Sequence, residues 1–424
     1  MTITDDPRSV VEGVARQSYG RLVAYLAART RDVAAAEDAL ADAFVTALRS
    51  WERDGVPERP EAWLMTTARR RMIDRGRHDR VRADAANTIR LMMHEHAPGV
   101  DEGDDGAFPD ERLKLLFVCA HPEIDRGVHT PLMLQVVLGL DAATIASAFL
   151  TSPATMGQRL SRAKARIRDA GIAFEIPDRR ELPPRLDAVL DAIYAAYGSG
   201  WDDVAGSDPR RCGLAVEAIW LARTLVQLMP GEPEARGLLS LILFCEARRQ
   251  ARRDEHGAYV PMSEQDVTRW SAPMLREAEA ELAAASAAKR PGRLQLEAAL
   301  QAAHVEGTLR RRTDWQAIAV LYEGLVRLSP TTGACVGRAV ALAEARTPAD
   351  GLAALDAIDP AAVKSYQPYW AARAHLLSRS GDWRAACDAY DRAIGLTEDA
   401  AARAFLLRRR AAHGGSAAAA STFA

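Results

Sequence analysis

Hydrophobic residues along this chain recur at helical spacing, and the alternating pattern of a β-strand is almost absent. Alanine and leucine, both strong helix formers, are abundant. The stretch SPATMGQRLSRAKARIRDAG shows the pattern clearly, because its apolar positions share one helix face. These positions are Met156, Leu160, Ala163 and Ile167. We therefore predict an all-α protein.

The remaining faces of that segment are cationic. From Pro153 to Arg168 there is no acidic residue, so the cations cannot pair with acids on the same helix. The preceding stretch DAATIASAFL predicts a short helix with an aspartate cap, and Pro153 suits the first turn of the next helix. A short helix, a tight turn and a basic amphipathic helix are typical of a helix-turn-helix that binds DNA.

The first turns of the second helix in such a motif reach base edges. We predict this role for Thr155, Gln158, Arg159 and Arg162, and a phosphate contact for Arg166. Arginine can pair with guanine and glutamine with adenine. The alternative is a solvated surface helix whose cations pair with acids.

A second basic segment is RPEAWLMTTARRRMIDRGRHDRVR. Seven arginines lie between Arg69 and Arg82, against two aspartates. Its apolar stripe is predicted to be Leu64, Ala68 and Met72. Trp63 is either a platform on which an unpaired base stacks or a core residue. Alone, this segment is a moderate indication of polyanion binding.

A third segment, RDVAAAEDALADAFVTALRSW, predicts an amphipathic helix with an acidic side. The residues expected to face a core are Leu40, Phe44, Ala47 and Leu48. The residues expected on an exposed acidic flank are Glu37, Asp38 and Asp42. Taken by itself, this flank indicates a solvated helix face.

The C-terminal half contains a repeat. DWQAIAVLYEGLVRLSP begins at Asp314, and DWRAACDAYDRAIGLTE begins at Asp382, 68 positions later. This offset is twice the 34-residue length of a tetratricopeptide repeat, and TPADGLAALDAI fills the intermediate position. The aligned pairs are Trp315 with Trp383, Ile318 with Ala386, Tyr322 with Tyr390, and Val326 with Ile394. We predict stacked helix pairs with a concave binding surface, and the alternative is an irregular helical domain.

Stretches rich in Gly, Pro and acids divide the chain into segments. The predicted segments are a helical domain at 8–95, an acidic linker at 96–110, a helix-turn-helix domain at 111–173, a Pro-rich joint at 174–186, a repeat domain at 187–412 and a disordered tail at 413–424.

Composition narrows the class of protein. The 424 residues carry a formal net charge of −2, so any polyanion site must be a local patch. The five cysteines have no paired spacing, which favours a reducing cytoplasm over a disulfide framework. The N-terminal stretch MTITDDPRSVVEG is acidic and has no apolar segment, so it is not a signal peptide. We predict a cytoplasmic protein that does not bind a membrane.

Indications of an enzyme are weak. No glycine-rich phosphate loop and no nucleophile elbow occur in the sequence. Cys119, His121 and His129 could approach one another around a metal, but no fourth ligand is evident. The histidines of the stretch HEH, at 94–96, lack the helix spacing of a zinc protease. We predict that the protein is not an enzyme and needs no cofactor.

Taken together, these segments resemble the extracytoplasmic-function sigma factors, which are the small two-domain members of the bacterial sigma-70 superfamily. AEDALADAFVTAL resembles their polymerase-binding helix, PEAWLMTTARRRMIDRGR their −10 helix and SPATMGQRLSRAKARIR their −35 helix. RLKLLFVCAHPEI, AGIAFEIP, LPPRLDAVLDAIYAAYGSGW and the repeats resemble the subgroup with a C-terminal tetratricopeptide-like extension. Many such sigma factors have Asn where this chain has Arg70, so −10 specificity does not transfer directly.

The resemblance implies a partner or a DNA element for each segment. It implies docking on a basic coiled coil of core RNA polymerase by Glu37, Asp38 and Asp42. It implies contacts to promoter DNA at −10 by Trp63, Arg69, Arg70, Asp74 and Arg77, and at −35 by the helix that begins at Pro153. The acidic linker would thread the polymerase interior, or it is simply a tether.

The resemblance also implies that the repeat extension regulates or braces the sigma domains, through an intramolecular contact or a further partner. The main alternative is a helix-turn-helix regulator that binds an operator and carries the repeats as a scaffold. The acidic helix beside an arginine-rich helix favours the sigma factor, because a plain regulator has no need of a polymerase-docking helix.

Overall fold

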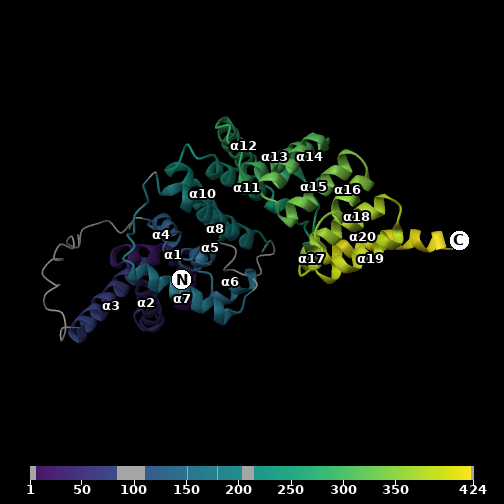
Figure 1. Ribbon diagram of the computed structural model, residues 1–424. Helices are drawn as coiled ribbons and strands as arrows, with labels where there is room; N and C mark the ends of the chain where they lie inside the picture. The colour runs from purple at the N-terminus through teal and green to yellow at the C-terminus, as the bar shows by residue number, and fades with distance from the viewer. Residues whose placement is uncertain (1–5, 84–109, 150, 179, 203–213, 422–424) are drawn as a thin grey trace. The chain divides into compact units, whose positions relative to one another are not determined.

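The computed structural model describes residues 6–83, 110–149, 151–178, 180–202 and 214–421. Among these residues the regular elements are helices, and the only β-type pairing is an isolated bridge between Arg253 and Tyr259. The all-α prediction is therefore confirmed (Figure 1). The chain divides into two compact units, Met1–Gly200 with Asp208–Leu221, and Trp201–Ser207 with Ala222–Ala424.

The first unit contains the three segments that the sequence indicated as DNA-binding or acidic. Its helices are α1 (Pro7–Thr30), α2 (Val33–Asp54), α3 (Pro60–Ala83), α4 (Arg112–Cys119), α5 (Arg126–Val136), α6 (Ala142–Ala148), α7 (Pro153–Asp169), α8 (Leu182–Asp202) and the first half of α10 (Leu214–Leu228). Aspartates cap several of them, as Asp32 does for α2, where its carboxylate accepts from the Ala35 amide at 3.0 Å.

Helices far apart in the sequence pack together in the first unit. Helices α1, α2 and α3 contact one another, α1 also contacts α4 and α5, and α2 contacts α7. The approach of α1 to the end of α5 is especially close, because a Cβ atom on Gly20 would lie 1.8 Å from the Val137 carbonyl oxygen. The N-terminal helices and the helix-turn-helix are therefore parts of one packed body.

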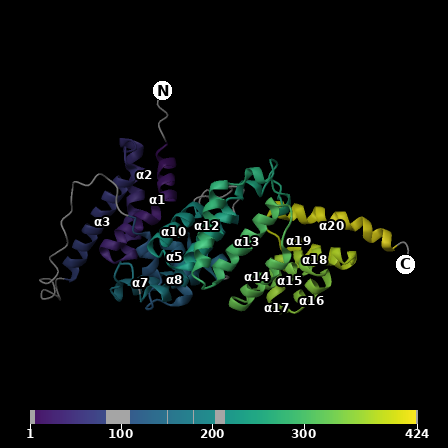
Figure 2. The same ribbon diagram turned by 90° about the horizontal axis from the view of Figure 1, so that it is seen from above.

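The second unit is built largely from neighbours in the chain (Figure 2). Its helices after α10 are α11 (Pro233–Glu246), α12 (Ala272–Ala287), α13 (Arg293–Leu309), α14 (Trp315–Leu328), α15 (Thr332–Ala345), α16 (Pro348–Asp356), α17 (Pro360–Val363), α18 (Gln367–Arg379), α19 (Trp383–Gly395) and α20 (Ala400–Ser421). Short 3₁₀ turns at Arg249–Ala251, Met262–Glu264 and Val267–Arg269 connect α11 to α12.

The two copies of the sequence repeat have the same local structure. Asp314 caps α14 by accepting from the Ala317 amide at 3.0 Å, and Asp382 caps α19 by accepting from the Ala385 amide at 3.1 Å. The aligned positions Ile318 and Ala386 are both fully buried. Helix α16 begins at the intermediate position, after the cap residue Thr347. Successive helices bury small apolar clusters between them, as expected for stacked helix pairs.

Two features differ from the segments expected from the sequence. Helix α8 and the first half of α10 belong to the first unit, and the boundary between units falls within α10 rather than near residue 187. Helix α20 continues to Ser421, into the tail predicted to be disordered, because the alanines there are the strongest helix formers. The acidic linker, apart from Asp110, lies outside the described residues, as does the HEH stretch.

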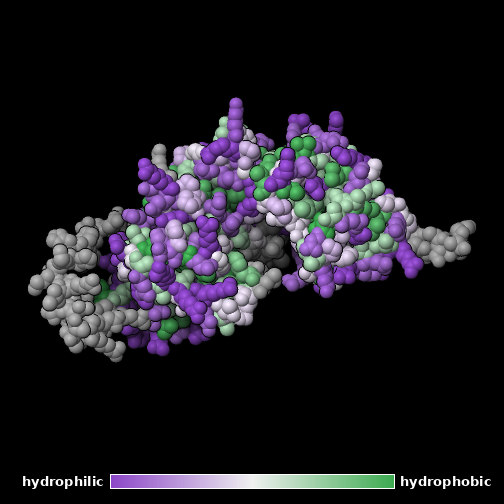
Figure 3. All heavy atoms as spheres, in the orientation of Figure 1, coloured by the Kyte–Doolittle hydropathy of each residue, from purple (hydrophilic) through white to green (hydrophobic). Residues whose placement is uncertain are grey.

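The face of the molecule drawn in Figure 3 is mainly polar. Figure 3 shows hydrophilic side chains over most of the visible face, with apolar ones in small groups. None of the helices in the described part of the chain is long and apolar enough to cross a membrane.

Candidate nucleic-acid interface

Helices α6 and α7 form the predicted helix-turn-helix. Asp141 caps α6 by accepting from the Thr144 amide at 2.8 Å and from its hydroxyl at 2.9 Å. Ser152 caps α7 by accepting from the Thr155 amide at 3.2 Å, and Pro153 occupies the first turn. The two helices contact each other, and α7 also packs on α5 and α2. Local capping chemistry thus fixes where each helix of the motif begins.

Helix α7 has the two faces expected from its sequence. The predicted stripe of Met156, Leu160, Ala163 and Ile167 is buried, with at most 7% of any member exposed. The residues predicted to read bases, Thr155, Gln158, Arg159 and Arg162, are all exposed. The side chains of Arg159 and Arg162 form no ion pair with another described residue. This face is available to a negatively charged ligand.

The other cations of α7 do have partners, which corrects the expectation that pairing is unavailable. Arg166 pairs with Glu123 of the α4–α5 turn, both half-exposed, and Arg168 pairs with its neighbour Asp169 at 2.9 Å. Lys164 pairs with Glu37 of α2 at 2.5 Å. Glu37 and Glu123 come from other elements, and Asp169 is the last residue of α7, so none of these acids lies within Pro153–Arg168.

The acidic flank of α2 is only partly as predicted. Asp38 and Asp42 are exposed, but Glu37 is largely buried against Lys164, so its expected exposure is wrong. The nearby Tyr19 phenol has a raised pKa, first because it is buried and second because the Glu37 carboxylate is close. Leu48 was expected in the core and is instead 37% exposed.

Both partners of the buried pair stand at the same kind of sequence position. Lys164 falls within the helical stripe Leu160, Ala163, Ile167, and Glu37 falls within the stripe Val33, Ala36, Leu40. Each is four residues after the first apolar member, a position that normally carries a core residue. Two opposite charges inside two apolar stripes are the signal that could have predicted this ion pair.

Helix α3 carries the residues predicted to contact DNA at −10. Arg70 and Asp74 are exposed and Arg69 is half-buried, whereas the side chain of Arg77 lies outside the described part of the structure. Trp63 is half-buried and meets the buried Trp51 edge to face, with ring centroids 5.4 Å apart. Trp63 is thus both a packing residue and partly accessible. Of the predicted stripe, Leu64 and Ala68 are buried and Met72 is half-buried.

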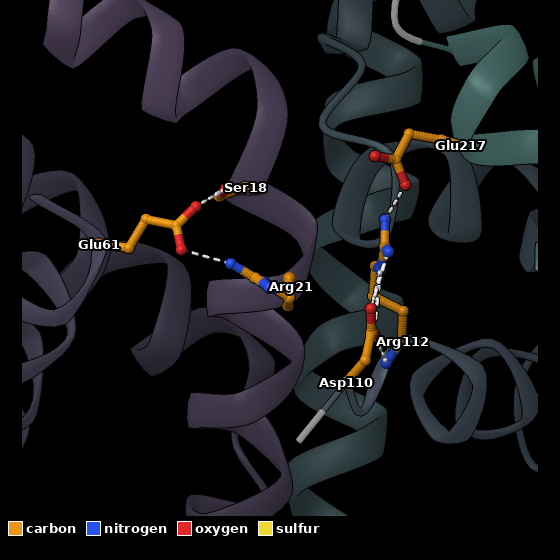
Figure 4. A network of polar contacts seen from close by, with 6 residues as sticks. All are labelled: Ser18, Arg21, Glu61, Asp110, Arg112 and Glu217. Carbon is orange, nitrogen blue, oxygen red and sulfur yellow. Dashed lines mark hydrogen bonds and ion pairs between the residues drawn. The ribbon is translucent and has the colours of Figure 1, made fainter. Parts of the chain in front are cut away.

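Helix α3 is anchored to α1 by polar contacts that the sequence did not suggest. The Glu61 carboxylate accepts from the Ser18 hydroxyl and from the Arg21 guanidinium (Figure 4). Ser18 is buried, whereas the side chains of Arg21 and Glu61 are 34% and 36% exposed, so the Arg21–Glu61 pair is partly accessible to solvent. The first turn of α3 is therefore held in place while its arginine-rich end extends away.

A second polar network joins the helix-turn-helix segment to α10 (Figure 4). Arg112, at the first turn of α4, is 8% exposed and pairs with Asp110 at 2.7 Å and with Glu217 of α10. Its guanidinium also lies over the Trp220 ring, 4.3 Å from the centroid. The first half of α10 is thus fastened to α4.

The residues that the sequence suggested as metal ligands, Cys119, His121 and His129, do not form a metal site in the described part of the structure. Burial raises the pKa of the Cys119 thiol, and the His129 ring nitrogen Nε2 lies 2.9 Å from the Ile124 carbonyl oxygen. Burial, and then the nearby Arg185, lower the pKa of His121. Within the described residues, no group of three or more His, Cys, Asp or Glu side chains could hold a metal ion.

Comparisons with known proteins match separate parts of the chain. The sigma-70 region 2 family matches residues 14–82, which span α1 to α3, and a family of unknown function (DUF6596) matches residues 185–286. An uncharacterized protein, R00370 of Rhizobium meliloti, is 37% identical over 392 residues, which cover 92% of each chain. A probable RNA polymerase sigma factor, RfaY of Xanthomonas campestris, is 32% identical over 168 residues, 36% of this chain and 40% of the relative. No solved structure gave a significant match.

The region 2 match and the similarity to RfaY support an RNA polymerase sigma factor, which is a transcription initiation factor rather than an enzyme. The chain belongs to one nearly full-length family with R00370, and its residues 14–82 are similar to sigma-70 region 2. A sigma-70 region 2 implies binding to core RNA polymerase and promoter DNA.

Proposed function

We propose that the protein is a sigma factor of the extracytoplasmic-function type that directs RNA polymerase to a condition-dependent set of promoters. Helix α2 docks on the polymerase, α3 holds the melted strand at −10, and α7 enters the major groove at −35. The helices after α7 form an extension that braces these parts, with tetratricopeptide-like repeats at its C-terminal end.

The observation that carries this proposal is the accessible face of α7. Arg159 and Arg162 are exposed without an acidic partner among the described residues, whereas the other cations of the helix are paired. An unpaired guanidinium can form two parallel hydrogen bonds to the guanine edge in the major groove. Arg166, which the sequence indicated as a phosphate contact, would have to exchange Glu123 for a phosphate.

The exposed face of α2 suits a protein partner. Asp38, Asp42, Val45 and Leu48 are all exposed and follow one another at helical spacing, so acidic and apolar side chains share a face. Val45 is 48% exposed and Leu48 is 37% exposed, so both offer apolar surface to a partner. A basic helical surface of the polymerase would pair with the two carboxylates and cover the two apolar side chains.

The DNA-melting role of α3 rests on its half-exposed tryptophan and its arginines. Trp63 has one side packed on Trp51, which leaves part of the indole accessible for stacking by an unpaired base. Arg69 and Arg70 lie two turns further along, suitably placed for backbone phosphates. Arg70 replaces the Asn that is common in such sigma factors, so we expect a different base preference at −10.

Bracing by the extension is supported by the network around Arg112. Arg112 is largely buried, pairs with Glu217 and stacks on Trp220, so it connects α4 to α10 of the extension. Removal of Glu217 would leave Arg112 with Asp110 as its one remaining acidic partner, which weakens the compensation of a largely buried charge. We therefore propose that the extension supports the helix-turn-helix segment and that a protein truncated after Pro177 loses transcription activity.

The test is transcription in vitro with core RNA polymerase and fragments of genomic DNA. We expect the protein to direct initiation at particular sites. Arg159→Ala and Arg162→Ala should each cost about 1–3 kcal/mol of discrimination at particular −35 positions. The matched control is Arg168→Ala, which removes the same charge from the same helix at an exposed position paired with Asp169.

Absence of initiation, combined with tight binding of the protein alone to an operator, would contradict the proposal and favour the operator-binding regulator. Uniform weakening on every sequence would make Arg159 and Arg162 phosphate contacts and remove their role in base reading.

A further inference from the structure

The segment between α11 and α12 folds into a strap, which we define as residues 249–270. Within it the chain turns back at Asp254, whose carboxylate accepts from the Ala258 amide at 2.8 Å. On either side of this turn, the Val260 amide donates to the Arg252 carbonyl oxygen at 2.9 Å. These bonds lie within the segment, so the strap keeps its shape without support from the neighbouring helices.

The strap docks on the far end of the repeat array. Arg253 forms an ion pair with Asp399, the residue that precedes α20. The Tyr259 ring meets the Phe405 ring of α20 edge to face, with centroids 5.3 Å apart. Arg253 and Asp399 are 146 positions apart, so the strap joins an early part of the second unit to its last helix.

A connection of this kind requires the helix array to curve. Helix α11 contacts α13, and α15 contacts α18, so the first helices of successive pairs form one layer that ends at α20. At about 8–10 Å per helix, a straight layer from α11 to α20 would span roughly 40 Å. The chain from Glu246 to Arg253 spans at most about 25 Å when extended. The array therefore curves, and the strap crosses its concave side, where the connection between the ends of a curved array is shortest.

The docking contacts of the strap are open to solvent. The side chain of Asp399 is 41% exposed where it meets Arg253, and the two aromatic rings are half-buried. A further pair joins Arg409 of α20 to Glu264 of the strap at 3.8 Å, and both side chains are half-exposed. Ion pairs between exposed side chains contribute little stability and are screened by salt. The contacts that hold the strap closed are therefore weak enough to break and form again.

The base of the strap is held more firmly. The Ser271 amide donates to the Ala247 carbonyl oxygen at 2.9 Å, and Trp270 is buried. We propose that the strap is a reversible lid on the concave side of the repeat array, which closes by docking on α20 and opens about its base. The partner that an open lid admits is an extended protein segment that offers α20 an arginine and an aromatic ring, as the strap does. This inference goes beyond the proposed function and does not depend on the promoter contacts.

The test measures the distance between the strap and α20 in the full-length protein. Spin labels are placed on His256→Cys at the turn of the strap and on Ala404→Cys of α20, both at exposed positions. Cys119 stays because it is fully buried, and the other native cysteines are replaced by Ala, namely Cys212, Cys245, Cys335 and Cys387. At low salt we expect one short distance. At high salt we expect a second population longer by about 10 Å, because the two arms of the strap's turn are each about four residues long.

Two independent variants should open the lid at low salt. Arg253→Glu places a second carboxylate opposite Asp399, and Tyr259→Ala removes the ring that meets Phe405. Each should move most of the population to the longer distance, whereas Arg253→Lys should keep the short one because it keeps the charge. The matched control is Arg276→Glu, the same charge reversal at an exposed position of α12.

The opened variant also tests the ligand chemistry. A fluorescent peptide with the sequence of residues 252–264 should bind the Arg253→Glu protein. It should bind the wild type at least about tenfold more weakly, because a tethered strap competes at an effective concentration near millimolar. Phe405→Ala in the opened variant should abolish the binding, because it removes the ring on which Tyr259 of the peptide packs.

A single short distance in both Arg253→Glu and Tyr259→Ala would overturn the proposal, as would an equally lengthened distance in Arg276→Glu. Absence of peptide binding to the opened variant would overturn the assignment of α20 as a peptide site. Circular dichroism identifies a variant that does not fold, and the salt dependence of the labelled protein without these substitutions then decides the result. These measurements need neither polymerase nor DNA, so failure of the proposed function would leave them valid.

Discussion

The two compact units are stabilised in different ways. In the first unit, contacts join helices that are far apart in the sequence, and largely buried ion pairs fasten α2 to α7 and α4 to α10. In the second unit, most packing is between neighbours in the chain, and each helix pair buries a small apolar cluster. The difference suggests that charge substitutions act at long range in the first unit, whereas substitutions in the second unit act locally.

The largest expected effect on folding is in an apolar cluster of the second unit. Leu376 is fully buried, so Leu376→Ala should lower the free energy of unfolding by about 3 kcal/mol. Hydrogen exchange should speed up in α15 to α19 and stay unchanged in the first unit. The control is Leu407→Ala, because Leu407 is 49% exposed and should cost less than about 0.5 kcal/mol. Faster exchange throughout the first unit would contradict the local character of this packing.

The next largest effect on the free energy of unfolding is expected when one of two ion pairs on α7 is removed, because one pair is largely buried and the other is half-exposed. Lys164→Ala leaves Glu37 largely buried without its partner and should cost about 2–3 kcal/mol. Arg166→Ala removes a half-exposed pair and should cost less than about 1 kcal/mol. Denaturant unfolding followed by a probe in the first unit measures both. Equal losses in the free energy of unfolding would show that burial does not make the Glu37–Lys164 pair more stabilising than the exposed pair.

These two cases also show what the sequence could predict. The stripe of α7, its cap and the repeat at Asp314 and Asp382 depend on local spacing, which the sequence displays directly. The pair between Glu37 and Lys164 depends on how two helices 127 positions apart approach each other. Spacing within one helix places each charge inside an apolar stripe, but it does not show which helix that stripe packs against.

Exposure was predicted correctly where it depends only on the position of a residue around its own helix, as for Arg159 and Arg162. The prediction was wrong where exposure depends on whether a neighbouring helix covers the residue. Glu37 is covered by α7, and Leu48 stays uncovered although it was assigned to the core. The role of α10 in holding Arg112 was missed for the same reason.

A smaller effect should appear in the pH dependence of the second unit. Burial, and then the nearby Arg248, lower the pKa of His304. The unfolded chain then binds a proton more readily than the folded one, so this contribution to stability is present above about pH 6.5 and declines as the pH falls below it. His304→Gln should flatten that decline, because the substituted side chain does not titrate. The control is His256→Gln at an exposed position. An equally flattened pH dependence of stability in that variant would contradict its assignment to His304.

The smallest effect on folding is expected at the exposed acids of α2. Asp38→Lys with Asp42→Lys should change the free energy of unfolding by less than about 1 kcal/mol, because both side chains are exposed. The same variant should lose co-purification with core polymerase, because a basic docking surface would then meet two cations. Retained co-purification in the folded variant would remove α2 from the polymerase contact.

The most direct measurement is a footprint of the polymerase on a promoter that this protein selects. We expect protection around −35 together with permanganate-reactive, unpaired thymines near −10, and both should require the protein and core polymerase together. Arg162→Ala should weaken the −35 protection, and Arg168→Ala should not. Protection by the protein alone, without unpaired thymines when polymerase is added, would contradict the assignment of a sigma factor.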